Sequence, residues 1–103
     1  MFARNVSFRL KSNTHSDYTR TLENDVLPIL RKQTGFKEEI TLSNPSSQDA
    51  VAISLWDSKA NADAYNTSQY PEVLKTLANL IDGTPKVQTF ESVASTLHTL
   101  VAA

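Results

Sequence analysis

The side chains of Asn5, Trp56, Tyr65 and Tyr70 have the chemistry to hold a flat organic molecule. An indole ring stacks on an aromatic ligand and can form one wall of a pocket. A strand amide such as that of Asn5 can donate a hydrogen bond to a phenolate or peroxide oxygen and so stabilise the charge that develops during a reaction. The two tyrosine hydroxyls can donate to a substrate oxygen in the same way.

Each of these side chains also has a purely structural interpretation. Trp56 can be a core residue that covers the start of the next helix, and the tyrosines can anchor an amphipathic helix. Asn5 can bond to a neighbouring segment, because a buried amide needs partners. Small residues favour the pocket, since Ala52 and Ser54 share a strand face with Trp56 and leave space beside the indole. We therefore predict catalytic roles for Asn5, Trp56 and Tyr65, and substrate contacts from Ala52, Ser54 and Tyr70.

The composition argues against several kinds of site. With no cysteine, the chain has no disulfide, no thiolate nucleophile and no sulfur-ligated metal. The histidines and carboxylates do not fall at metal-ligand spacing, and two glycines cannot build a phosphate-binding loop. We therefore expect no metal and no cofactor. Ten basic residues against eleven acidic ones leave a formal net charge of −1, which argues against a nucleic-acid partner.

The length and hydropathy are those of one globular domain. The 103 residues, 40% of them apolar, fit a single domain over residues 1–103. No stretch is apolar for long enough to cross a membrane, and the N-terminus lacks the basic and apolar regions of a signal peptide. We therefore expect a cytoplasmic protein with no membrane partner.

Alternating apolar residues predict four strands, over 2–11, 36–43, 49–56 and from 86 to about 100. In the first strand an apolar face is interrupted by one charged exception, Arg4. In the second strand the pattern places Phe36 on one face with Glu38, Ile40 and Leu42. In the third strand the face opposite the alanines carries Val51, Ile53 and Leu55.

Apolar spacings of three and four predict two helical regions between these strands. The first covers 16–33; Pro28 loosens it and Gly35 ends it. The second begins at Ser58, breaks near Thr67, restarts around Pro71 and ends at Gly83. Its apolar stripe consists of Val73, Leu74, Leu77, Leu80 and Ile81.

The element order is therefore β-α-β followed by β-α-β. Such a chain forms an α+β, ferredoxin-like fold, in which a four-stranded antiparallel sheet carries both helical regions on one face. The other sheet face also has apolar content and must be covered. We expect a homodimer in which two sheets meet face to face, with the long last strand reaching the partner.

These segments resemble the antibiotic-biosynthesis-monooxygenase-type proteins. The resemblance lies in Ile53-Ser54-Leu55-Trp56-Asp57-Ser58, in the alanine-bearing helix with Tyr65, Ser68 and Tyr70, in Gly35-Phe36, and in a proline late in the first helix. It extends over the element order of the whole chain. It implies a dimeric α/β barrel with a pocket between the sheet and the helices of each chain.

The same resemblance implies several possible activities. Some members of that family are cofactor-independent monooxygenases that oxidise polycyclic aromatic phenols to quinones, and others degrade haem with an Asn, a Trp and a His. Asn5 matches the strand-one Asn, but Tyr65 stands at the Trp position and Lys75 at the His position, which argues against haem degradation. Of the monooxygenase set of Asn, Trp, Tyr and Arg, the first three correspond to Asn5, Trp56 and Tyr65, and no Arg corresponds.

Three hypotheses about function follow. The first is a cofactor-independent monooxygenase that acts on a small aromatic or quinol-like substrate, whose anion itself donates an electron to oxygen. The second is a non-catalytic dimeric protein on the same fold that binds a small molecule or acts under stress. The third is haem binding. Whether the chain is an enzyme stays open at this point.

Overall fold

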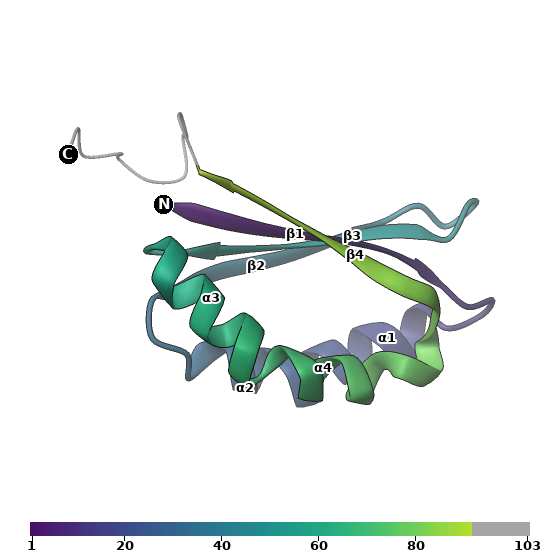
Figure 1. Ribbon diagram of the computed structural model, residues 1–103. Helices are drawn as coiled ribbons and strands as arrows, with labels where there is room; N and C mark the ends of the chain where they lie inside the picture. The colour runs from purple at the N-terminus through teal and green to yellow at the C-terminus, as the bar shows by residue number, and fades with distance from the viewer. Residues whose placement is uncertain (92–103) are drawn as a thin grey trace.

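The computed structural model describes residues 1–91, which form one sheet and one layer of helices (Figure 1). The sheet contains β1 (Phe2–Leu10), β2 (Phe36–Ser43), β3 (Asp49–Trp56) and β4 (Ile81–Glu91). The helical layer contains α1 (His15–Thr21), the π-helical η1 (Leu22–Val26), α2 (Leu27–Arg31), α3 (Lys59–Ser68), α4 (Tyr70–Leu77) and the 3-10 turn η2 (Ala78–Leu80).

The strands are in the order β2-β3-β1-β4, and every neighbouring pair is antiparallel. All helices cover the same face of this sheet (Figure 1). The predicted ferredoxin-like α+β architecture is therefore confirmed. The core lies between the two layers and is built on the alternate residues of β1 that face the helices, namely Phe2, Val6, Phe8 and Leu10.

The second strand differs from its predicted pattern at its start. Phe36 pairs with Trp56, but the next paired residue is Glu38, which stands opposite Leu55. This bulge contains one extra residue and turns Phe36 toward the helices, where its ring meets the edge of Trp56 at a centroid distance of 5.5 Å. Phe36 therefore does not share a face with Glu38, Ile40 and Leu42, as the simple alternation predicted.

The first helical region is loosened near Pro28, as predicted. The five residues of η1 form a π-helical turn, and Pro28 lies in the first turn of α2, where a missing N–H is tolerated. In the second region, the Ser58 hydroxyl accepts a hydrogen bond from the Asn61 N–H at 3.2 Å, which caps α3. The break falls at Gln69, and α4 begins with Pro71 in its first turn.

The prediction for the end of this region is wrong. The helix ends at Leu77 and η2 at Leu80, and Ile81 already belongs to β4, where it pairs with Leu10. Ile81 is buried, so its position fits a helical stripe although the residue packs from a strand. Gly83 has a φ of 73° within β4, in the stretch where the register with β1 shifts. The predicted continuation of this strand to about residue 100 lies outside the described residues.

No helix in residues 1–91 is long and apolar enough to span a membrane.

Candidate functional site

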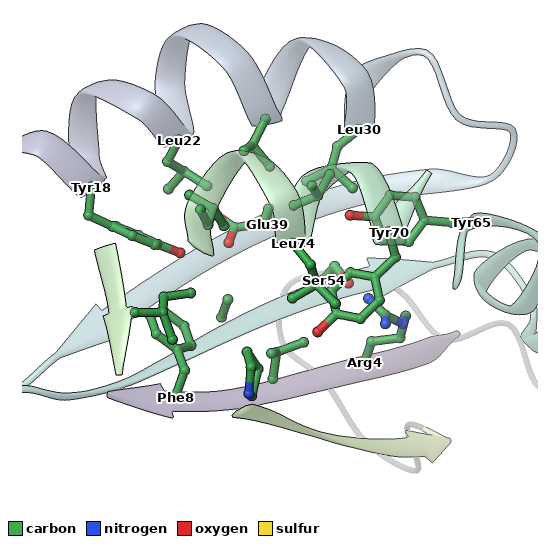
Figure 2. A pocket seen from close by; sticks show the side chains of 17 residues that line it. Arg4, Phe8, Tyr18, Leu22, Leu30, Glu39, Ser54, Tyr65, Tyr70 and Leu74 are labelled. Atoms are coloured by element: carbon green, nitrogen blue, oxygen red, sulfur yellow. The ribbon is translucent and has the colours of Figure 1, made fainter. Parts of the chain in front are cut away.

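A pocket lies between the sheet and the helices, and its walls come from all four strands and from α1, η1, α2, α3 and α4 (Figure 2). Its apolar lining includes Val6, Phe8, Leu22, Leu74 and Ile81. Its polar lining consists of Arg4, Tyr18, Glu39, Ser54, Tyr65 and Tyr70. The cavity measures about 50 Å³, or about 520 Å³ when the space toward solvent is included. Since pockets for drug-sized ligands measure roughly 300–1,000 Å³, a ring-bearing ligand has to displace side chains to enter.

Arg4 is a buried cation that makes no contact ion pair in the described part of the chain, although the Asp63 carboxylate acts on it from a distance. Only 3% of the residue is exposed, and among residues 1–91 it forms no ion pair. Its Nη2 donates to Asn66 Oδ1 at 2.8 Å, and its guanidinium carbon lies 5.1 Å from the Tyr65 ring centre and 4.4 Å from that of Tyr70. Burial lowers the pKa of Arg4, yet a guanidinium stays protonated in proteins. The pocket therefore holds a positive charge that an anionic ligand can neutralise.

The aromatic side of the pocket is a series of packed rings. Tyr65 stacks on Trp56 at a centroid distance of 5.1 Å and an interplanar angle of 29°, and Tyr70 lies 6.1 Å from Tyr65. Trp56 is fully buried and its Nε1 donates to Ser54 Oγ at 2.9 Å. The Tyr70 hydroxyl is buried beside the Arg4 guanidinium, which interacts with its oxygen, and the hydroxyl proton has no acceptor among residues 1–91. That hydroxyl is thus available to a ligand oxygen.

The structure brings together most of the residues predicted for the site. Ala52, Ser54, Tyr65 and Tyr70 all line the pocket. Trp56 does not line it but lies directly behind Tyr65 and supports that ring.

Asn5 lies on the other face of the sheet. It pairs with Ile53 of β3 and Gln88 of β4, and it alternates with the buried residues Arg4 and Val6 that face the helices. Because the sheet separates the Asn5 side chain from Tyr65, the two residues cannot contact the same ligand within one chain.

Three polar lining residues were missed by the sequence interpretation: Arg4, Tyr18 and Glu39. Arg4 had a visible signal, because a charged residue that interrupts the apolar face of a strand points into the core. Glu39 and Thr41 face the helices because the bulge at the start of β2 sets that register, and no local pattern reveals it. Tyr18 gives no local signal, because its location in the pocket depends on how α1 packs on the sheet.

The environment of these residues shifts their acidity. Burial raises the pKa of Tyr18 to about 12 and that of Tyr65 to about 12. Burial also raises the pKa of Glu39, and the hydrogen bond that Thr41 Oγ1 donates to Glu39 Oε2 at 2.7 Å opposes that rise. The tyrosines therefore remain hydrogen-bond donors, while the Glu39 carboxyl holds a proton more tightly than an exposed glutamate does.

The described residues contain no group of three or more His, Cys, Asp or Glu side chains that could hold a metal. Lys75, at the position of the haem-ligating His in the family resemblance, is exposed on α4 and pairs with Glu72 at 3.4 Å. Its side chain does not line the pocket.

No protein-family model matches the sequence, and no curated protein matches it. Solved structures do match its fold. A monooxygenase from Streptomyces coelicolor, solved with the ligand nanaomycin D, superimposes with a TM-score of 0.76 at 17% identity, over 95% of this chain and 92% of the other. The chain has the fold of antibiotic-biosynthesis-monooxygenase-type proteins.

Two further structures agree. A candidate antibiotic biosynthesis monooxygenase from Bordetella bronchiseptica matches with a TM-score of 0.75 at 14% identity, over 90% of this chain and 97% of the other. A protein of unknown function from Nitrosomonas europaea matches with a TM-score of 0.76 at 19% identity, over 94% of this chain and 93% of the other. At these identities the likeness concerns the fold, and it confirms the resemblance found in the sequence at that level.

Proposed function

We propose that this protein is a cofactor-independent monooxygenase that oxidises a small aromatic hydroxyl compound in the pocket between sheet and helices. The observation that carries the proposal is the buried, unpaired Arg4 guanidinium between two tyrosine rings. An aromatic hydroxyl compound supplies a flat ring for the apolar walls and, once ionised, an anion for this cation.

The reaction needs only the substrate and dioxygen. The phenolate donates an electron to oxygen, one oxygen atom then adds to a ring carbon, and the other leaves as water. The water carries the two hydrogens that the substrate loses, one from the hydroxyl and one from the ring carbon, and a quinone remains. The protein contributes orientation, a water-poor site and charge stabilisation by Arg4 and the tyrosine hydroxyls.

The proposal is supported by the fold, because a protein with the same fold binds nanaomycin D and is a monooxygenase. The small cavity means that substrate binding must open the helical layer. The break at Gln69 and the π-helical η1 border the pocket on two sides and are the places where the helical hydrogen-bond ladder is interrupted.

Oxygen uptake in the presence of a naphthol and anthrone panel tests this function. We expect Arg4→Met to reduce kcat/KM by roughly 10–100-fold, because one charged hydrogen bond contributes about 1.5–3 kcal/mol. Methionine keeps the volume and removes the charge, so the fold should tolerate it. Arg9→Met is the matched control, since Arg9 is an exposed residue of the same strand. Equal activity of the two variants would contradict the proposal.

A second candidate is a binding protein that does not catalyse, because a buried guanidinium between two tyrosine rings can hold an aromatic anion without reacting with it. Calorimetry with the same panel separates the two. Saturable binding that is lost in Arg4→Met, without oxygen uptake by the wild type, would establish the binding function in place of the oxygenase.

A further inference from the structure

Glu39, Ser54 and Arg4 form a row across three strands of the pocket floor. Ser54 of β3 pairs with Glu39 of β2 on one side and with Arg4 of β1 on the other. Neighbouring strands are about 4.8 Å apart, so the backbones of Glu39 and Arg4 lie roughly 10 Å from each other. Both side chains line the pocket, and Figure 2 shows them entering it on either side of Ser54. A carboxyl group and a guanidinium thus line the same cavity from either side of Ser54.

Glu39 is not neutralised by a neighbour. Within residues 1–91 it forms no ion pair, and its one hydrogen bond is the one that Thr41 donates to Oε2. Arg4 likewise forms no ion pair within the described residues, and the Asp63 carboxylate acts on it only from beyond contact distance. Both charges act on the Tyr65 hydroxyl. Besides the effect of burial, Arg4 lowers the pKa of Tyr65 and Glu39 raises it. A ligand beside Tyr65 therefore lies within the field of both groups.

Glu39 is also the one carboxylate in the described lining of the pocket. The other polar groups that face it are Arg4 from β1, Ser54 from β3, Tyr18 from α1, Tyr65 from α3 and Tyr70 from α4. A guanidinium cannot accept a proton, and the tyrosines are buried and remain protonated. The residues that face the pocket from η1, α2 and α4 are otherwise apolar: Leu22, Val26, Leu30, Val73, Leu74 and Leu77.

We infer that Glu39 is the general base of the pocket and takes the hydroxyl proton of the aromatic ligand as it binds. The ligand O–H bond breaks, the proton moves to Glu39 Oε1, and the electron pair stays on the ligand oxygen. The negative charge spreads over the ring toward Arg4, while the protonated carboxyl donates a hydrogen bond back to the oxygen. This inference rests on the proposed function, because it assigns the step that prepares that substrate for oxygen.

The acid–base behaviour of Glu39 can be measured without any ligand. Because its pKa is raised in the folded chain, the folded state binds the proton more tightly than the unfolded state. The contribution of Glu39 to the free energy of unfolding therefore falls as the pH rises from the ordinary pKa of a glutamate through the raised pKa of Glu39. Glu39→Gln should remove this loss and be more stable than the wild type above that range, as measured by urea unfolding at several pH values.

Binding of 2-naphthol tests the proton transfer, because naphthol and naphtholate have different absorption spectra. At about pH 7, where the free naphthol is neutral, the wild type should bind it as naphtholate, and Glu39→Gln should bind it as neutral naphthol. Oxygen uptake should fall by roughly 10²–10⁴-fold in Glu39→Gln, the usual contribution of a general base. Glu38→Gln is the control, since Glu38 pairs with Leu55 and faces away from the helices.

The other possible outcomes distinguish the role of Glu39 from the existence of the aromatic site. Naphtholate in both the wild type and Glu39→Gln would show that Arg4 alone ionises the ligand, and neutral naphthol in the wild type would show that no proton moves. Either result refutes the role of Glu39 and leaves the aromatic site intact. Failure of the wild type to bind 2-naphthol would refute the aromatic site and this inference together.

Discussion

Trp56 acts on the pocket through its contacts and not by touching a ligand. Its indole is fully buried, stacks on Tyr65 and donates to Ser54 Oγ. Tyr65 in turn lies over the Arg4 guanidinium, so the position of the cation depends on the indole behind it. The hydrogen bond between Trp56 and Ser54 is therefore a structural support of the site.

Ser54→Ala should lower the free energy of unfolding by about 1–3 kcal/mol, because it leaves the indole N–H unpaired in the core. In a Trp56→Phe background the same substitution should cost much less, since no N–H then needs an acceptor. Urea unfolding of the four proteins in this double-mutant cycle measures the difference. An equal cost of Ser54→Ala in both backgrounds would show that the bond contributes nothing to stability.

At the residue scale, sequence reasoning identified the pocket wall but not its charges. The small residues of β3 and the two tyrosines were predictable, because residue size and strand alternation are local properties. Asn5 was chosen for its chemistry, although alternation from Phe2 already placed it opposite the core. The roles of Arg4 and Glu39 depend on their common neighbour Ser54, which is a property of strand pairing that no single segment contains.

At the element scale, Gly35 sets the path from α2 into β2. Its φ of 79° lies in the left-handed region, and its carbonyl oxygen accepts from the Asp57 N–H at 2.8 Å. The turn also brings α3 close, because a Cβ at this position would lie 2.1 Å from Asn61 Nδ2. Glycine is therefore required at this position for two reasons: the backbone has a positive φ, and a side chain would collide with Asn61.

Comparing Gly35→Ala with Gly83→Ala separates the effect of the positive φ from the effect of the collision with Asn61. Both positions have positive φ, so both variants should lose about 1–2 kcal/mol of unfolding free energy from the backbone alone. Gly83 has nothing within 4 Å of a Cβ, whereas Gly35 has Asn61, so Gly35→Ala should be the less stable variant in thermal and urea unfolding. Adding Asn61→Ala should recover most of the extra loss. If the two alanine variants are equally stable, the contact with α3 is not restrictive.

The boundaries that sequence reasoning missed lie where one strand bulges against another. The shift after Phe36 and the shift opposite Gly83 both alter which residues face the helices. Apolar spacing describes regular elements and cannot place an extra residue, because the bulge is fixed by the partner strand. The order of elements was predictable, since it depends only on the change of period along the chain.

At the scale of the whole molecule, the sheet has one covered face and one open face. The open face carries Ile40, Leu42 and Phe90, which are 53%, 51% and 54% exposed. Strand pairing places Ile40 beside Ile53 and Leu42 beside Val51 in β3, whereas Phe90 of β4 pairs with Ala3 of β1. We propose that a second copy of the chain covers this face. The apolar side chains of this face gather on β2 and β3, and β1 adds a polar strip of Asn5, Ser7 and Arg9 beside them. An exposed apolar patch on a sheet face suits a symmetric sheet-to-sheet contact.

Ile53→Glu tests the contact at its centre, because Ile53 lies on the third strand between Asn5 and Ile40. The wild type should have the molar mass of two chains by light scattering at micromolar concentration, and Ile53→Glu that of one, since a buried unpaired carboxylate opposes association. Ala64→Glu, on the exposed side of α3, adds the same charge and should remain dimeric. Circular dichroism shows whether each variant is folded. A wild type that stays monomeric would refute the pairing, and the open face would then need another explanation.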